Sequence, residues 1–188
     1  MIKNLEAEEI METVGVIGLG DMGSGLAKNL MTAGYETYGF DVNVVRLDAF
    51  AAAGGHPVHS AAAVASAATT VFVMVMTGEQ AKAAILGDGL ISTMRPGGTI
   101  VLTATIRPSE AMDIGLALEG SGINLVDSPV SGGFAGAQGG ALTMMAAGTD
   151  VALARAHPAM AAVSSTIHHV GAEIGMGQTV KACLQSLT

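Results

Sequence analysis

The sequence predicts an α/β fold built on a doubly wound, mostly parallel sheet, and three observations support this fold class. Half of the residues are apolar and only 13% are charged, which supplies the material for a sizeable core. Short β-branched runs alternate with segments of helix length, many of which end at glycines. A glycine-rich turn follows the first such run, where a strand is expected to pass directly into a helix.

Strands and helices are expected in alternation along the first half of the chain. The strands are rich in β-branched or aromatic residues, and they span residues 13–17, 35–40 and 70–76. The helices carry apolar or small residues at helical spacing, and they span residues 24–31, 43–53 and 60–68. Gly34 and the Gly54-Gly55 pair end the first two helices, and residues 54–57 predict a turn.

The second half continues the alternation, which predicts right-handed crossovers between parallel strands. The expected strands span residues 99–102, 124–127, 141–147 and 166–170. The expected helices span residues 79–86, 108–119, 151–163 and 178–187. We expect Pro158 to kink or break the third of these helices, and residues 131–140 to form a glycine-rich loop.

The chain is expected to divide into a tail over residues 1–12, one domain over residues 13–174, and the start of a further helix over residues 175–188. The tail carries four glutamates, unlike a secretory signal, and Cys183 is the only cysteine of the sequence. These features favour a cytoplasmic protein without disulfides. The uncharged stretch from Gly54 to Gly78 is long enough to span a bilayer, but its turn, helix and strand signals favour packing on a sheet instead.

The charge balance argues against a nucleic-acid partner. The formal net charge is −8, and the eight Lys and Arg residues are scattered instead of clustered, as a phosphate-tracking surface would need. An anionic ligand must therefore be held by helix N-termini, backbone N–H groups and one or two placed cations.

The first motif, Gly18-Leu19-Gly20-Asp21-Met22-Gly23, has the G-x-G-x-x-G pattern of a dinucleotide-binding turn. It follows an expected strand and opens an expected helix. An acidic residue, Asp41, lies 18 positions after Gly23. In this pattern the first glycine permits the turn, the second admits the pyrophosphate and the third allows the helix to pack closely on the sheet. A tight turn without a ligand, or the glycine-rich turn of a methyltransferase, remains open on this motif alone.

Asp41 favours NAD as the cofactor. Its carboxylate can accept hydrogen bonds from the adenosine ribose, whereas it would repel the 2′-phosphate of NADP. Arg46 lies five residues further on and can pair with a 2′-phosphate, so NADP stays possible.

Two further motifs follow later in the chain. Asp127-Ser-Pro-Val-Ser131-Gly132-Gly133 ends an expected parallel strand, where its hydroxyl and backbone N–H groups can bind a carboxylate, although a plain turn is equally compatible. The segment Gly175-Met-Gly177-Gln-Thr-Val-Lys181-Ala-Cys-Leu-Gln185 places Lys181 and Gln185 on one helix face. Lys181 is a candidate acid/base group, or else a surface lysine that lies along the helix.

Together the three motifs resemble those of the β-hydroxyacid dehydrogenase family, which includes 3-hydroxyisobutyrate, tartronate semialdehyde and L-threonate dehydrogenases. The match also includes Ala27-Lys-Asn-Leu30 after the first motif, and it keeps the same order over nearly the whole chain. The resemblance implies a Rossmann domain, an interdomain helix that begins near residue 175, and a reversible oxidation of a small 3-hydroxy acid by NAD or NADP. It also implies a homo-oligomer, and an all-helical C-terminal domain that this sequence lacks.

The resemblance assigns roles to several residues. Lys181 would be the catalytic lysine, while Ser131, Gly132 and Gly133 would hold the substrate carboxylate. Residues at four strand ends would contact the cofactor, namely Gly18 to Gly23, Asp41, Met76, Thr77 and Thr105. Thr77-Gly78 departs from the Leu-Pro that is usual in the family, and Gln185 replaces its usual Asn. Gln185 resembles the L-threonate dehydrogenase branch and would contact the substrate.

Two functions are therefore weighed: a dehydrogenase, and a non-catalytic dinucleotide-binding or oligomerisation module. Lys181 within the third motif favours the enzyme. Without the second domain to cover the cleft, we expect dinucleotide binding with slow turnover. No metal is expected, since His168 and His169 are neighbours on a strand and point to opposite faces.

Overall fold

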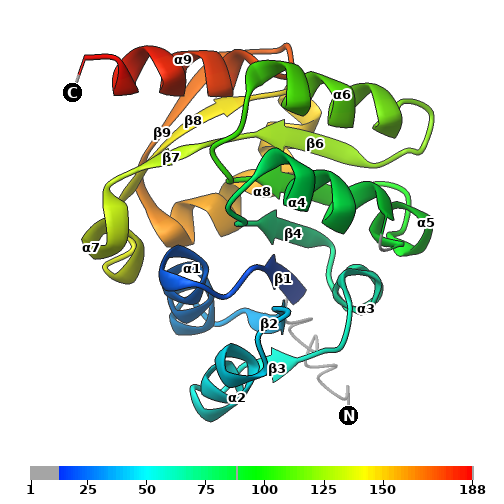
Figure 1. Ribbon diagram of the computed structural model, residues 1–188, viewed down its shortest axis with the longest axis vertical. Coiled ribbons are helices and arrows are strands. Elements are labelled where there is room, and N and C mark those ends of the chain that lie inside the picture. Colours follow the sequence, from blue (N-terminus) through cyan, green and yellow to red (C-terminus); the bar gives the residue numbers. More distant parts are fainter. Residues whose placement is uncertain (1–12, 88, 188) are drawn as a thin grey trace, which may run out of the picture.

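The computed structural model describes residues 13–87 and 89–187, and these residues form one mixed sheet with helices on both faces (Figure 1). The strand order is β3-β2-β1-β4-β5-β6-β8-β7, and β9 pairs with β8. The strands are β1 (Thr13–Ile17), β2 (Glu36–Phe40), β3 (His56–Pro57), β4 (Thr70–Val73), β5 (Thr99–Leu102), β6 (Asn124–Asp127), β7 (Val130–Ser131), β8 (Leu142–Ala147) and β9 (Ser164–Gly171).

The pairing confirms the doubly wound, mostly parallel sheet. All pairs from β3 to β6 are parallel, and so is the pair of β8 with β9. Only β8 runs antiparallel to its neighbours β6 and β7. The carboxyl ends of β1, β4, β5 and β6 therefore meet at one edge of the sheet, which is where ligands bind in open α/β folds.

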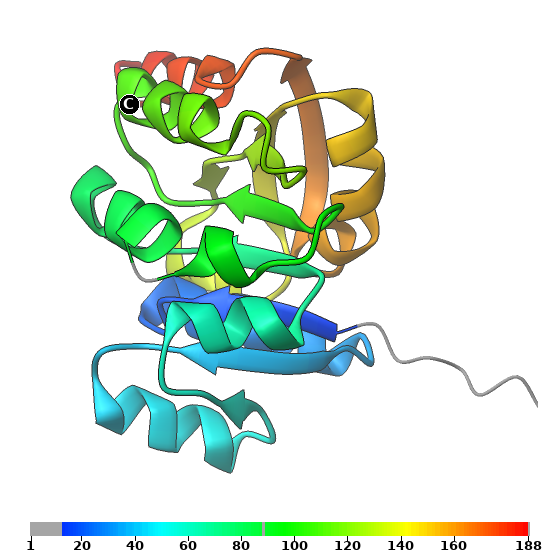
Figure 2. The ribbon, with the colours of Figure 1, turned by 90° about the vertical axis from the view of Figure 1, so that its right-hand side faces the viewer.

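The helices form two layers with the sheet between them (Figure 2). One layer contains α1 (Asp21–Thr32), α2 (Val44–Ala52), α7 (Gly133–Gln138) and α8 (Asp150–Val163). The other contains α3 (Ala61–Ala67), α4 (Gly78–Lys82), a π-helical turn (Ala83–Gly87), α5 (Leu90–Thr93), α6 (Pro108–Leu118) and α9 (Met176–Gln185).

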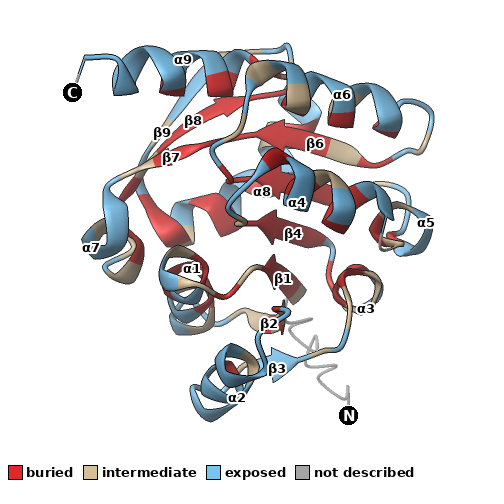
Figure 3. Ribbon diagram, viewed as in Figure 1, coloured by how far each residue is buried: buried red, intermediate tan, exposed pale blue. Residues whose placement is uncertain are grey.

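Each face of the sheet has its own apolar core because side chains alternate along the strands. Phe72, Val101 and Val126 face α1 and α8. Their chain neighbours Val71 and Ile100 face α3, α5 and α6. The central strands are consequently buried on both faces, as the continuous apolar runs in the sequence predicted (Figure 3).

Several predicted bounds were wrong. The strand expected over 70–76 ends at Val73, because β1 ends at Ile17 and offers Met74 only one more hydrogen bond. The helix expected from residue 24 begins at Asp21, directly after the glycine turn. The helix expected over 79–86 divides into α4 and the π-helical turn.

The segments expected to be loop or turn also contain structure. Residues 131–140, expected as a loop, contain the end of β7 and the whole of α7, and the turn over 54–57 contains β3. Pro158 lies inside α8 without ending it. Both Pro158 and Ala154, whose carbonyl loses its helical partner, are exposed, so water can satisfy that carbonyl. Among the described helices, none is long and apolar enough to cross a membrane.

Candidate functional site

The glycine turn between β1 and α1 has two glycines that the fold itself requires. Gly18 has a φ of +90°, and a side chain there would collide with the carbonyl of Met74. A side chain at Gly23 would collide with the carbonyl oxygen of Gly18, so Gly23 lets α1 start tightly against the turn. These two residues fix the path of the turn whether or not a ligand binds.

Gly20 differs from the other two glycines, because nothing in the fold excludes a side chain there. Its φ is −67°, and the nearest atom to a built Cβ belongs to the guanidinium of Arg46, at 3.6 Å. No side chain caps the N-terminus of α1, which begins at the next residue. Only the exposed side chain of Arg46 lies over Gly20, and with the uncapped N–H groups this fits a pyrophosphate, which needs close access to this backbone.

Asp41 closes the turn from the end of β2. Its carboxylate accepts hydrogen bonds from the Leu19 N–H at 2.7 Å and the Asn43 N–H at 2.8 Å. Arg46 Nη1 lies 3.4 Å from Asp41 Oδ2, with its side chain 49% exposed and that of Asp41 only 4% exposed. Oδ2 accepts from both Leu19 and Arg46, whereas Oδ1 accepts only from Asn43 and can take a further bond from a ribose hydroxyl. The guanidinium beside it offers a cation to a phosphate.

A hollow of about 600 Å³ lies between the loops after β4 and β5. It brings together the predicted cofactor residues Met76, Thr77 and Thr105, and Ala182 of α9 lines it as well. Arg107 and Glu110, which we did not predict, lie at its rim and form an ion pair of 2.8 Å. The hydrogen bond from Arg107 holds the pKa of Glu110 below its usual value.

The substrate loop predicted at Ser131, Gly132 and Gly133 joins β7 to α7. Gly132 and Gly133 have φ values of +127° and +57°, which favour glycine at both positions. Helix α7, which follows this loop, is tied to α1, because Asn29 of α1 donates to the carbonyl of Ala137 at 2.8 Å. The predicted carboxylate loop therefore leads directly into a helix that packs on α1.

The third motif begins α9 with two glycines that have separate roles. Gly175 has a φ of +98°, and its N–H donates to Asp127 Oδ2 at 2.9 Å. A side chain at Gly177 would lie 2.5 Å from the carbonyl oxygen of Met145, so this glycine lets α9 pack directly on β8. Figure 1 shows α9 beside β8 and α6.

Lys181 is buried on α9, with 9% of its surface exposed. Its side chain makes no hydrogen bond or ion pair with any described residue. In the described part of the chain, Ser128 Oγ is the one side-chain N or O atom that is both fully enclosed and without a partner. The ammonium of Lys181 also has no partner, so it is not fully enclosed and solvent reaches it. Gln185, one turn further along α9, is exposed.

Asp127 and Gln178 are polar residues of this region that sequence reasoning missed. Both are buried, and burial raises the pKa of Asp127 even though hydrogen bonds from Gln178 and α9 backbone N–H groups oppose the shift. The available signal was their place inside the second and third motifs, next to the glycines. The hydroxyl, the N–H groups and the lysine of those motifs suffice to suggest a ligand site, and neither Asp127 nor Gln178 is needed for that interpretation.

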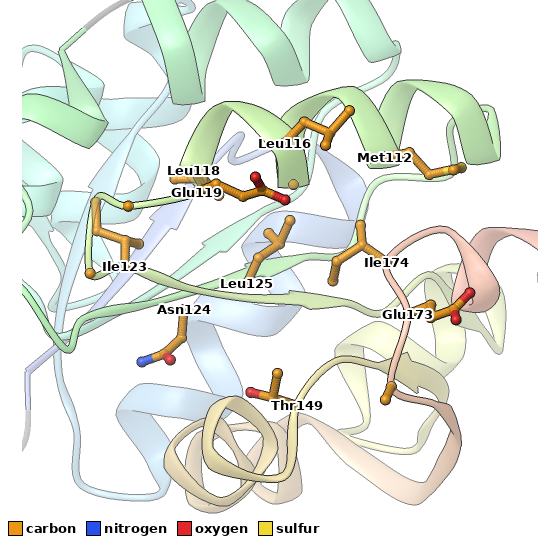
Figure 4. Close-up of a pocket in the computed structure, with 14 residues that line it drawn as sticks. Met112, Leu116, Leu118, Glu119, Ile123, Asn124, Leu125, Thr149, Glu173 and Ile174 are labelled. Atoms are coloured by element: carbon orange, nitrogen blue, oxygen red, sulfur yellow. The ribbon is translucent and has the colours of Figure 1, made fainter.

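A second hollow, of about 680 Å³, lies between α6 and the segment before α9 (Figure 4). Leu116, Leu118, Ile123, Leu125 and Ile174 give it an apolar lining. None of the residues predicted to bind cofactor or substrate contributes to it. Within residues 13–87 and 89–187, no group of three or more His, Cys, Asp or Glu side chains could hold a metal ion.

Comparison with known proteins matches residues 13–171 to the NAD binding domain of 6-phosphogluconate dehydrogenase. The chain is 36% identical over 176 residues to an L-threonate dehydrogenase of Escherichia coli O6:H1. The matched region covers 93% of this chain and 58% of that protein. It is 36% identical over 178 residues to the NAD-dependent L-serine dehydrogenase of Pseudomonas aeruginosa. That match covers 94% of this chain and 59% of that protein.

A crystal structure of 3-hydroxyisobutyrate dehydrogenase from Salmonella typhimurium has the same fold over the matched region. The TM-score is 0.89 at 34% sequence identity, and the match covers 94% of this chain and 62% of that one. The chain thus spans about three-fifths of the length of these relatives.

Proposed function

The chain belongs to the β-hydroxyacid dehydrogenase family and carries its NAD-binding domain, and from that premise we propose that it transfers a hydride between NAD(P) and a small 3-hydroxy acid. The observation that supports this most is the convergence of three groups at one sheet edge. The glycine turn and the loops of Thr77 and Thr105 follow parallel strands that end at the same edge, and Ala182, next to Lys181 on α9, lines the hollow with Thr77 and Thr105.

The proposed cofactor site uses the geometry of the first βα unit. The N–H groups at the start of α1 would receive the pyrophosphate over Gly20, and Asp41 would accept bonds from the adenosine ribose. The hollow lined by Met76, Thr77 and Thr105 would take the nicotinamide half. When bound, the nicotinamide ring supplies the acceptor or donor of the hydride.

The proposed substrate site would be formed by the loop before α7 and by α9. Ser131 and the N–H groups of Gly132 and Gly133 would orient the carboxylate, and Gln185 would bind a hydroxyl group of the substrate. Lys181 would hold the reacting hydroxyl and handle its proton. In the oxidation its neutral amine would accept the hydroxyl proton while the carbon that bears the hydroxyl loses its hydride to the nicotinamide, and in the reduction the ammonium would return the proton.

The experiment is a substrate panel on the purified chain. Threonate, glycerate and 3-hydroxyisobutyrate are each mixed with NAD or NADP at stoichiometric enzyme, and the absorbance of the reduced nicotinamide is followed. Lactate, a 2-hydroxy acid, serves as the control. We expect reduction by at least one 3-hydroxy acid and none by lactate. If NAD binds but no 3-hydroxy acid reduces it, the chain is a dinucleotide-binding module and the proposal fails.

A further inference from the structure

Asp127 and Gln178 form a buried polar pair beneath the first turn of α9. Asp127 is 0% exposed and Gln178 is 1% exposed. Gln178 Nε2 donates to Asp127 Oδ1 at 2.8 Å. A buried carboxylate and a buried amide are each costly unless their hydrogen bonds are satisfied, so a pair at this place calls for an explanation.

Gln178 connects three segments that are far apart in the sequence. Besides Asp127 at the end of β6, its amide donates to the Ala104 carbonyl at 3.0 Å and accepts from the Ile106 N–H at 2.9 Å. Thr105 lies between those two backbone contacts, and it lines the hollow proposed for the nicotinamide. One side chain on α9 therefore fixes the backbone on both sides of Thr105.

Asp127 fixes the start of α9 itself. Its Oδ2 accepts from the N–H groups of Gly175 at 2.9 Å and Gln178 at 3.2 Å. No side chain of α9 caps this end, so the cap comes from a strand 48 residues earlier. An ionised carboxylate is also favoured next to a helix N-terminus.

Lys181 lies three residues after Gln178, one turn along the same helix. Its side chain makes no hydrogen bond or ion pair with a described residue, so the position of its ammonium depends on where α9 lies and on the side chains that bury it. The direction of α9 is in turn fixed by Asp127 and Gln178.

We propose that Asp127 and Gln178 are positioning residues, which set the distance between Lys181 and the loop of Thr105 and so align the proton-transfer group with the cofactor. This inference deepens the proposed function and rests on it, since Lys181 acts there as the proton-transfer group. Small misplacements of such a group are known to cost large factors in rate.

The test uses Gln178→Glu, Asp127→Asn and the double variant. Gln178→Glu places two carboxylates together and removes the amide donors. Asp127→Asn introduces a donor where the amide of Gln178 already donates. In the double variant, position 127 supplies the donor and position 178 supplies the acceptor. It should therefore recover part of what each single change loses. Cys183→Ala, an exposed change on the same helix, is the matched control.

The kinetic readout is the separation of kcat from cofactor binding. We expect each single variant to lower kcat about 10- to 100-fold, with the Kd for NAD within about 2-fold of the wild type, and the double variant to recover at least a third of the loss on a logarithmic scale. A kcat for both single variants equal to that of Cys183→Ala would overturn the proposal. So would a folded double variant no faster than the slower single variant.

A second readout does not need activity. The lysines are dimethylated with ¹³C-formaldehyde, and the Lys181 signal is assigned by its loss in Lys181→Arg. We expect its chemical shift to change in both single variants, to move back in the double variant, and to stay in place in Cys183→Ala. An unchanged Lys181 signal in the folded single variants contradicts the positioning role. If the wild type has no dehydrogenase activity, the proposed function fails, while this spectrum still decides the positioning role.

Discussion

The backbone N–H of Leu19 donates a 2.7 Å hydrogen bond to the carboxylate of Asp41, 22 residues further along the chain. Asp41 was expected to contact only the ribose, but it also holds the glycine turn that would receive the pyrophosphate. The two parts of the proposed cofactor site are thus one unit, and a change at Asp41 alters both. Variants that separate binding from folding must therefore be made elsewhere in the turn.

The variant Gly20→Ala should separate cofactor binding from folding. Its backbone accepts alanine, and the built Cβ meets nothing within 3.5 Å, so we expect the free energy of unfolding to stay within about 0.5 kcal/mol of the wild type. The added methyl group occupies the space proposed for the pyrophosphate, and the Kd for NAD should rise at least about 10-fold, or about 1.4 kcal/mol. Calorimetric titration and urea unfolding measure the two quantities.

Gly87→Ala is the control for that experiment, because Gly87 is exposed and no atom lies near its built Cβ. It should change neither quantity. An unchanged NAD affinity in Gly20→Ala would mean that the pyrophosphate does not lie over this residue.

Arg46→Ala should distinguish the two dinucleotides. The guanidinium lies beside Asp41 and over Gly20, where a 2′-phosphate would gain a charge-assisted hydrogen bond. We expect the affinity for NADP to fall at least about 10-fold and that for NAD to change less than about 3-fold. Arg95→Ala, an exposed change outside the site, serves for comparison in the same titrations. Equal losses for both dinucleotides would show that Arg46 does not read the 2′-position.

Ser128→Ala should stabilise the protein. Ser128 Oγ is buried with no hydrogen-bond partner among the described residues, and an unsatisfied buried hydroxyl costs about 1–3 kcal/mol. We expect urea unfolding to show a gain of about 1 kcal/mol. Thr103→Val removes a buried hydroxyl that does donate, to the Val73 carbonyl at 2.9 Å, and should cost about 1 kcal/mol instead. A loss of stability in Ser128→Ala would reveal a partner for this hydroxyl.

Asp127 gives a prediction about pH. Burial raises its pKa in the folded chain above the ordinary value of 3.8, so the unfolded chain loses this proton at lower pH. Its contribution to stability is fully present below the unfolded pKa and is lost as pH rises through the folded pKa. The stability of the wild type relative to Asp127→Asn should therefore fall from about pH 3 upward and then level off. A relative stability that rises with pH would mean that the hydrogen bonds outweigh burial.

The sequence predicted the sheet well because its central strands are buried on both faces. The runs that became β1, β5 and β6 had the bounds expected of them, since β-branched residues, glycine stops and chain length all agree there. Strand β4 came out shorter than expected, since its end depends on where β1 stops, and the periodicity of one segment carries no such information.

The site was predicted in part for a similar reason. Glycines at fixed spacing mark a turn, and the parallel sheet then brings Thr77 and Thr105 to one hollow. The pair of Asp127 with Gln178 depends on contacts between residues 51 positions apart, which no local pattern records. The extra bond from Leu19 to Asp41 is a long-range contact of the same kind.

The most direct test of the central claim is the rate of NAD reduction by the best 3-hydroxy acid of the panel in Lys181→Met. Methionine keeps an unbranched side chain that is one atom shorter and cannot transfer a proton, whereas Lys28→Met makes the same change at an exposed site on α1. We predict at least about a 100-fold loss of kcat in Lys181→Met with NAD affinity retained, and no loss in Lys28→Met. A rate in Lys181→Met equal to the wild-type rate would contradict the account.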